Sequence, residues 1–180
     1  MANLPWYALH VRARHEKAVD RILRDRGYEA LLPMYRARRR WSDRIREVEL
    51  PLFPCYVFCR FDPHSLIPIM VTPGVIRPIS FGNRIVPVDE EEIRAVQAVI
   101  GSRLNCEPWP YFRTGQRVRI EHGCLSGLEG FVQLVKNRFR LVVNVTLLQR
   151  SCAVEIDQAW LSPAPPDSSR MIHDPAKRSG

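Results

Sequence analysis

The chain has 180 residues, a formal net charge of +8 and a hydrophobic fraction of 46%. This length suits one large domain or two small ones, and no apolar run approaches the roughly 18–20 residues that a membrane helix needs. The first residues lack a basic stretch followed by an apolar core, so no signal peptide is expected. Five cysteines, an odd number without framework spacing, favour reduced thiols. We therefore expect a cytoplasmic protein that does not bind a membrane.

The positive charge is concentrated near the N-terminus. Residues 12–46 contain twelve Lys or Arg against five Asp or Glu, and the densest part, residues 36–46, has Trp41 interleaved. Such a patch favours nucleic acid or an acidic protein surface. The alternative is a solvated, flexible hairpin that happens to be basic.

The first third of the chain predicts a strand, a helix and a hairpin. Residues 6–11 form a short apolar run, and residues 14–26 switch to helical period. Gly27 stands where a helix commonly ends. Residues 28–41 and 47–53 are predicted to leave the body and return, with an Arg-rich tip between them.

The middle of the chain continues the sheet. Residues 54–61 are apolar on both faces, which predicts a central strand. Residues 62–70 suit only a short helical turn because Pro68 limits its length. Residues 75–79 and 85–88 flank the turn signal at Gly82 and Asn83, which indicates a hairpin.

A second long helix is predicted from Asp89 to Gly101. Asp89 is expected to cap it, Glu92 to complete a capping box, and the acidic first turn suits the positive end of the helix dipole. The order of these elements predicts an α/β sandwich, an antiparallel sheet with two main helices, over residues 1–101.

The remainder is predicted to be mostly β. Residues 102–112 lack periodicity and are expected to be a linker. Residues 113–161 alternate apolar and basic positions around a Gly-rich turn, which predicts a small SH3-like β-barrel. Residues 162–180 are turn-rich and lack core residues, so we expect a disordered tail. The fold class is therefore α+β.

No constellation for catalysis or metal binding stands out. The five histidines are scattered, and neither a nucleophile elbow nor a phosphate-binding loop is present. The cysteines lack the spacing of a metal site. We therefore expect no catalytic residue, no metal, no cofactor and no enzymatic activity.

Phe53 is the aromatic residue with the best prospect of exposure, because it lies between Pro51 and Pro54 at a strand entry. An exposed aromatic flanked by prolines is a common interface anchor. The alternative is a ring folded back over the edge of the sheet.

The ordered motifs resemble a known family. The N-terminal part, with Trp6-Tyr7-Ala8-Leu9, Phe53-Pro54-Cys55-Tyr56-Val57-Phe58 and Thr72-Pro73-Gly74-Val75, resembles the N-terminal (NGN) domain of NusG proteins. The segment from Gly115-Gln116-Arg117-Val118 through Leu128-Glu129-Gly130-Phe131-Val132 resembles a KOW domain. The resemblance covers about residues 4–161.

This resemblance implies a monomeric transcription elongation factor. In the family, the NGN domain binds the clamp helices of the RNA polymerase β′ subunit through an apolar patch and reaches the β-subunit gate loop, which suppresses pausing and modulates termination. The polymerase-binding residues implied here are Phe53, Trp6, Tyr7 and Tyr56.

The resemblance also implies nucleic-acid and KOW partners. Upstream or non-template DNA would contact a basic helix face and hairpin, and the implied residues are Arg14, Lys17, Arg21, Arg36, Arg38, Arg39 and Arg40. The KOW domain would bind nascent RNA, the ribosome or Rho through Leu148 and Arg150. A different hypothesis is a ribosomal or RNA-binding KOW protein, since KOW units also occur in translation proteins.

Three departures from the family pattern favour a specialised paralogue of the RfaH, LoaP and polysaccharide-operon type. Cys55 replaces the usual glycine of the F-P-G-Y motif. Leu148 replaces the aromatic residue of the KOW loop. Residues 75–88 are more similar to specialised than to housekeeping members. We predict that residues 113–161 take the β-form and not a helical hairpin, because Val142-Val143 and Val145-Thr146 favour strand.

Overall fold

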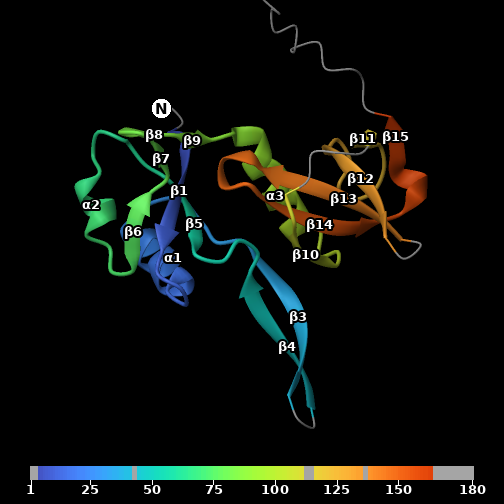
Figure 1. Cartoon of the computed structure of the whole chain (residues 1–180), viewed down its shortest axis with the longest axis horizontal. Coiled ribbons are helices and arrows are strands. Elements are labelled where there is room, and N and C mark those ends of the chain that lie inside the picture. Colours follow the sequence, from blue (N-terminus) through green and yellow to red (C-terminus); the bar gives the residue numbers. More distant parts are fainter. Residues whose placement is uncertain (1–3, 42–43, 112–115, 136–137, 164–180) are drawn as a thin grey trace, which may run out of the picture.

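The computed structural model describes residues 4–41, 44–111, 116–135 and 138–163. Its two main β-sheets lie side by side, with a long hairpin projecting between them (Figure 1). The first sheet has the order β2-β5-β1-β6, with β9 also paired to β1, and all of its pairings are antiparallel. Its strands are β1 (Trp6–Val11), β2 (Ala30–Leu31), β5 (Tyr56–Arg60), β6 (Val75–Pro78) and β9 (Pro87–Val88).

The helices cover opposite faces of this sheet, because neighbouring residues of β1 point to opposite sides. Tyr7 and Leu9 pack with Val19 and Leu23 of α1 (Glu16–Asp25), and we call this cluster the α1-side core. Trp6 and Ala8 pack instead with Ile93, Val96 and Val99 of α3 (Glu90–Gly101), and we call that cluster the α3-side core. The predicted antiparallel α/β sandwich is confirmed.

The ends of the two long helices agree in part with the features predicted from the sequence. Gly27 follows α1 with a φ of +84°, a backbone conformation that glycine adopts easily. Asp89 caps α3, because its Oδ1 accepts the backbone N–H of Glu91 at 2.8 Å. The predicted capping-box role of Glu92 is wrong, since this side chain accepts hydrogen bonds from Thr146 instead. The contact with Thr146, which is distant in sequence, thus takes the place of the local capping box.

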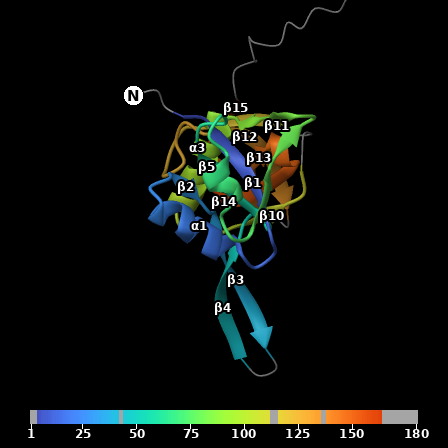
Figure 2. The same cartoon turned by 90° about the vertical axis from the view of Figure 1, so that its left-hand side faces the viewer.

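The basic hairpin consists of β3 (Met34–Trp41) and β4 (Arg44–Pro51). The two strands pair continuously, from Met34 opposite Pro51 to Trp41 opposite Arg44. Both views show it extending well beyond the two sheets (Figures 1 and 2). The predicted hairpin is confirmed, and its tip at residues 42–43 lies outside the described residues.

Two short elements complete the N-terminal half. Helix α2 (Ile67–Met70) is a single turn, in agreement with the limit that Pro68 sets. Strands β7 (Ser80–Phe81) and β8 (Arg84–Ile85) form a small hairpin around Gly82 and Asn83, so the predicted turn is confirmed. The predicted arms, residues 75–79 and 85–88, are for the most part wrong, because β6 and β9 pair with β1 instead.

The second sheet has the order β10-β14-β13-β12-β11-β15. Its strands are β10 (Cys106–Trp109), β11 (Gln116–Ile120), β12 (Glu129–Val135), β13 (Arg138–Val145), β14 (Arg150–Ile156) and β15 (Leu161–Pro163), with 3₁₀ turns η1 (Thr146–Leu148) and η2 (Gln158–Trp160). Gly130 allows β12 and β13 to approach, because a Cβ there would lie 2.7 Å from the Val142 carbonyl oxygen. The predicted β-form is confirmed.

Two boundaries differ from the prediction. Residues 102–112 do not form an unstructured linker throughout, because β10 pairs with β14 over four residues, from Cys106 opposite Val154 to Trp109 opposite Ser151. Ser162 and Pro163 belong to β15, which pairs with β11, and not to a tail. The rest of the predicted tail, residues 164–180, lies outside the described residues.

Candidate protein and nucleic-acid interfaces

The aromatic residues expected to bind a protein partner are largely buried. Phe53 is 1% exposed and its ring meets that of Phe58 edge-on, with 5.9 Å between centroids. The predicted exposure of Phe53 is therefore wrong in this conformation, and the alternative of a ring folded over the sheet is correct. Its proline neighbours signal a strand entry, while its burial depends on packing that a local pattern does not report.

The other three predicted aromatic residues do not all share one face. Trp6 lies buried in the α3-side core beneath the Arg60 guanidinium, 4.7 Å from the ring centroid. Tyr56 is half-buried on the same side, with the His10 ring 5.6 Å away. Tyr7 points the opposite way and packs against Phe61 in the α1-side core, at 4.7 Å. The fold thus brings Phe53, Trp6 and Tyr56 to one face and leaves Tyr7 on the other.

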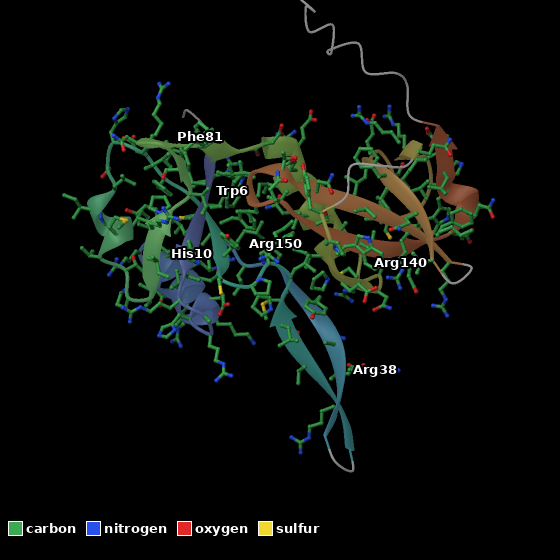
Figure 3. All side chains as sticks on the ribbon, viewed as in Figure 1. Trp6, His10, Arg38, Phe81, Arg140 and Arg150 are labelled. Atoms are coloured by element: carbon green, nitrogen blue, oxygen red, sulfur yellow. The ribbon has the colours of Figure 1, made fainter. Side chains whose placement is uncertain are left out.

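The KOW loop η1 packs against the same core. Leu148 is 8% exposed and belongs to the α3-side core together with Phe53 and Trp6. The residue next in that loop, Gln149, has a φ of +51°. Arg150, the second KOW residue singled out by the sequence, is exposed and lies toward the N-terminal half (Figure 3). Two surfaces predicted to bind separate partners are therefore parts of one apolar cluster.

Hydrogen bonds between Thr146 of the KOW loop and Glu92 of α3 join the two halves of the chain. The Thr146 backbone N–H donates to Glu92 at 3.1 Å to Oε1 and 2.9 Å to Oε2, and the Thr146 hydroxyl donates to Oε1 at 2.5 Å. Burial raises the pKa of Glu92 above its ordinary value, although the two groups of Thr146 favour the carboxylate. Sequence reasoning missed this contact, because the two residues are 54 positions apart.

The basic positions lie on two elements. On and before α1, Arg14 and Lys17 are exposed, and the Arg21 guanidinium lies 3.8 Å from Asp25. On the hairpin, Arg36 and Arg38 are exposed, and Arg38 lies 3.5 Å from Glu47. The side chains of Arg39 and Arg40 lie outside the described residues.

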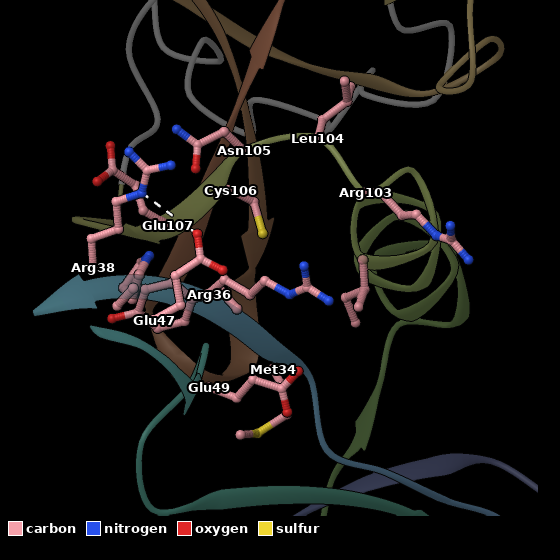
Figure 4. Close-up of a pocket in the computed structure, with 14 residues that line it drawn as sticks. Met34, Arg36, Arg38, Glu47, Glu49, Arg103, Leu104, Asn105, Cys106 and Glu107 are labelled. Atoms are coloured by element: carbon pink, nitrogen blue, oxygen red, sulfur yellow. Dashed lines mark ion pairs between the residues drawn. The ribbon is translucent and has the colours of Figure 1, made fainter. Parts of the chain in front are cut away.

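A groove separates the base of the hairpin from β10. It has a volume of about 1330 Å³. Figure 4 shows Arg36, Arg38, Glu47 and Glu49 of the hairpin on one wall. Because arginine and glutamate alternate along this wall, the groove does not concentrate charge of one sign, and it gives no reason to expect a polyanion there.

The described residues offer no group of three or more His, Cys, Asp or Glu side chains placed to hold a metal ion. Burial raises the pKa of the Cys59 and Cys152 thiols to about 12, so both stay protonated and unreactive near neutral pH. In the same part of the chain, no helix has the length and apolar character needed to cross a membrane.

Comparisons with known proteins agree with one another. A family model described as "Transcription termination factor nusG" matches residues 4–97. The "Transcription termination/antitermination protein NusG" of Thermus thermophilus is 27% identical over 176 residues, covering 86% of this chain and 96% of that protein. The protein of the same name from Borreliella burgdorferi is also 27% identical, covering 84% and 94%.

A solved structure described as "Domain interaction in Thermotoga maritima NusG" has a TM-score of 0.53 and covers 89% of this chain and 97% of its own. With 22% sequence identity, that likeness concerns the fold alone.

Proposed function

The chain belongs to the NusG family, and we propose that it binds RNA polymerase during elongation, suppresses pausing and modulates termination at particular operons. It is a transcription factor and not an enzyme. The observation that carries the proposal is the family match over residues 4–97, which spans the whole first sheet with α1 and most of α3. A binding mechanism suffices, because a ligand that prefers one polymerase conformation raises the population of that conformation. We place this activity in the cytoplasm.

The proposed polymerase contact is the α3-side face formed by Phe53, Trp6 and Tyr56. Phe53 and Leu148 belong to one core in this conformation, and we propose that the face becomes available when the KOW loop leaves α3. We propose that the clamp helices of the β′ subunit replace the KOW loop on this face. The fourth predicted residue, Tyr7, is buried in the α1-side core, so we propose that it supports the sheet from that side instead of contacting the polymerase directly.

The proposed DNA contacts are the exposed cations of α1 and the hairpin. Arg14, Lys17 and Arg36 have no carboxylate within ion-pair distance in the described part of the chain. Arg21 and Arg38 have exposed partners, and exposed ion pairs contribute little and exchange readily. With Arg39 and Arg40 they would bind the phosphates of upstream or non-template DNA, with salt-dependent affinity and little sequence preference. The opposite end of the NGN domain is proposed to reach the gate loop.

The KOW loop would bind its own partner, RNA, the ribosome or Rho, through Leu148 and Arg150. Leu148 requires the same separation as Phe53, while Arg150 is already exposed. The leucine in place of the aromatic residue, together with Cys55, supports a specialised factor over a housekeeping one.

The activity is tested by transcription in vitro across pause sites and terminators placed behind several leader sequences. We expect shorter pauses and altered termination on a subset of the leaders. Equal effects on all leaders would contradict the specialised role, and no effect on any leader would contradict the proposed activity.

The polymerase contact is tested by titration of a β′ fragment that carries the clamp helices. Phe53→Ala should weaken binding by about 1–3 kcal/mol, the scale of a truncated interface anchor. The matched control is Phe61→Ala, because Phe61 is equally buried but belongs to the α1-side core. Equal losses in both variants, each checked for folding by circular dichroism, would mean that Phe53 acts through stability alone.

A further inference from the structure

The most exposed large apolar side chain among the described residues is Phe81, at 86%. It lies on the β7–β8 hairpin, at the end of the N-terminal half away from Arg38 of the long hairpin (Figure 3). Neither the proposed polymerase face nor the proposed DNA contacts on α1 and the long hairpin include it. An aromatic ring this open to solvent has both of its faces free to bind.

The hairpin holds this ring on a firm base. The Ile79 backbone N–H donates to the Ala8 carbonyl at 2.8 Å, and the Val86 N–H donates to the Ile79 carbonyl at 3.3 Å. Ile79 packs on the α3-side core and Ile85 on the α1-side core. The turn itself is tight, and Gly82 takes a φ of +58° at its first central position. Phe81 is thus presented by a short, anchored structure, which limits the entropy lost when it binds.

A cation stands beside the ring. Phe81 and Arg84 are directly opposite in the β7–β8 ladder, so their side chains share one face with Cβ atoms about 5 Å apart. Arg84 is exposed, and in the described part of the chain it forms no ion pair, unlike Arg60 or Arg94. The guanidinium therefore remains free for a ligand.

Carboxylates are absent from the surrounding sequence. Residues 63–88 contain no Asp or Glu. In the acidic turn that follows, Glu90 pairs with Arg60 at 2.6 Å, while Asp89 and Glu92 accept hydrogen bonds from uncharged groups and keep their charge. The 26 residues from 63 to 88 thus add no negative charge that would repel a polyanion from Arg84, and acidic side chains begin only at Asp89.

We propose that the β7–β8 turn is a binding site for single-stranded polynucleotide, in which Phe81 stacks on an unpaired base and Arg84 binds the adjoining phosphate. Base stacking on an exposed aromatic ring combined with backbone attraction to a cation is the chemistry by which single strands are bound without strict sequence preference. Duplex bases are already stacked on each other, so the ring has no free base to accept in a double helix. The site is separate from the proposed polymerase face, and its test needs no polymerase.

The test measures the affinity of the full chain for fluorescent oligo(dT) and oligo(U) of about 15 nucleotides, within the size that single-strand binders cover. Phe81→Ala should weaken binding about five- to hundredfold, the effect of one lost base stack, without changing the slope of log K against log salt. Arg84→Gln should instead reduce that slope by about 0.7, the value for one phosphate contact on a single strand. A larger loss for one oligonucleotide supports the site and identifies the strand as DNA or RNA.

The matched control is Leu134→Ala, since Leu134 is also an exposed apolar side chain, at 59%, but belongs to β12 of the second sheet. It should leave affinity unchanged, and duplex DNA should bind the Phe81→Ala variant as it binds the parent. Equal affinities of the Phe81→Ala and Leu134→Ala variants for both oligonucleotides would overturn the proposal. A Phe81→Ala loss seen only for RNA polymerase would also overturn it, because the turn would then be a protein contact.

A spectroscopic measurement covers the case in which the other basic surfaces dominate the affinity. In Phe81→Trp, stacking should quench additional tryptophan emission when oligonucleotide is added, relative to the parent and to Leu134→Trp. Equal quenching in the two tryptophan variants would contradict stacking at residue 81.

Discussion

Replacing Glu92 with alanine removes the acceptor that joins α3 to the KOW loop. In the structure this carboxylate accepts the Thr146 N–H at 2.9 Å and the Thr146 hydroxyl at 2.5 Å. Hydrogen bonds to charged groups contribute about 1.5–3 kcal/mol each in favourable settings. Burial of the carboxylate raises its pKa, so desolvation offsets most of the energy of these bonds for the ionised group. The cost of Glu92→Ala is mainly that of leaving the Thr146 N–H and hydroxyl without this acceptor, and because the contact borders solvent we take about 1–2 kcal/mol for it.

This energy changes the binding affinity because it sets the fraction of molecules in which the α3-side face is open. The apparent Kd for a ligand of the open state is the intrinsic Kd divided by that fraction. If the closed state dominates, Glu92→Ala should tighten binding of the clamp-helix fragment about five- to thirtyfold, since 1.4 kcal/mol is a factor of ten. Thr146→Val should give a smaller gain, because its backbone N–H still donates to Glu92.

Isothermal titration of the full chain with the clamp-helix fragment measures this effect. The matched control is Glu91→Ala, which removes an exposed carboxylate from the same helical turn without touching Thr146. Both variants lose a charge near the positive end of the helix dipole, so that contribution cancels. Equal affinities of Glu92→Ala, Glu91→Ala and the parent would refute the reasoning, because the Thr146 contact would then have no part in covering Phe53.

Three further outcomes are expected. The affinity for the clamp-helix fragment should fall as the pH is lowered from neutral toward the ordinary Glu value of 4.5, because we propose that the packed KOW loop supplies the burial that raises the pKa of Glu92 in this conformation. The closed conformation is then favoured below that ordinary value and loses this contribution as the pH rises through the raised pKa. Glu92→Ala should abolish the dependence. Cys55→Gly should stabilise the chain by about 1 kcal/mol, seen as a rise in Tm of about 2–4 °C, because Cys55 has a φ of +68° that costs an L-residue more than glycine. Cys124→Gly, at a position without a positive φ, is its control and should lower Tm. In Phe53→Ala combined with Glu92→Ala, the gain in clamp-helix affinity should disappear, and a double variant that binds as tightly as Glu92→Ala alone would show that the exposed face does not use Phe53.

The elements with a clear period were predictable from the sequence. Strand β1 is predicted by a short apolar run and helix α1 by its helical spacing, each within about ten residues, and Gly27 ends the helix for a local reason. Cys55 was recognised as a departure from the family's glycine. Its positive φ, and the Glu16 carboxylate that accepts its N–H at 2.9 Å, required the structure.

The features that were missed depend on residues distant in sequence. Strand β10 contains Pro108 and lacks alternation, but it lies at the edge of its sheet, where a missing N–H is tolerated, and its partner β14 begins more than forty residues later. The sequence predicts that Phe53 and Leu148 each lie on a surface of their own domain, and only the packed pair of domains places them in one core. The role of Glu92 was misassigned for the same reason, because its partner Thr146 is in the other domain.

Strand β10 also determines how far the barrel can travel. It is one of the two edge strands of the second sheet, and only residues 102–105 separate it from the last residue of α3. Four residues reach about 14 Å when fully extended. This short linker therefore limits the movement of the C-terminal domain to a small region beside α3. Even after the Glu92 contact opens, the KOW loop stays at a high effective concentration near the face it has left. A polymerase must therefore compete with the covalently linked KOW loop for this face throughout elongation.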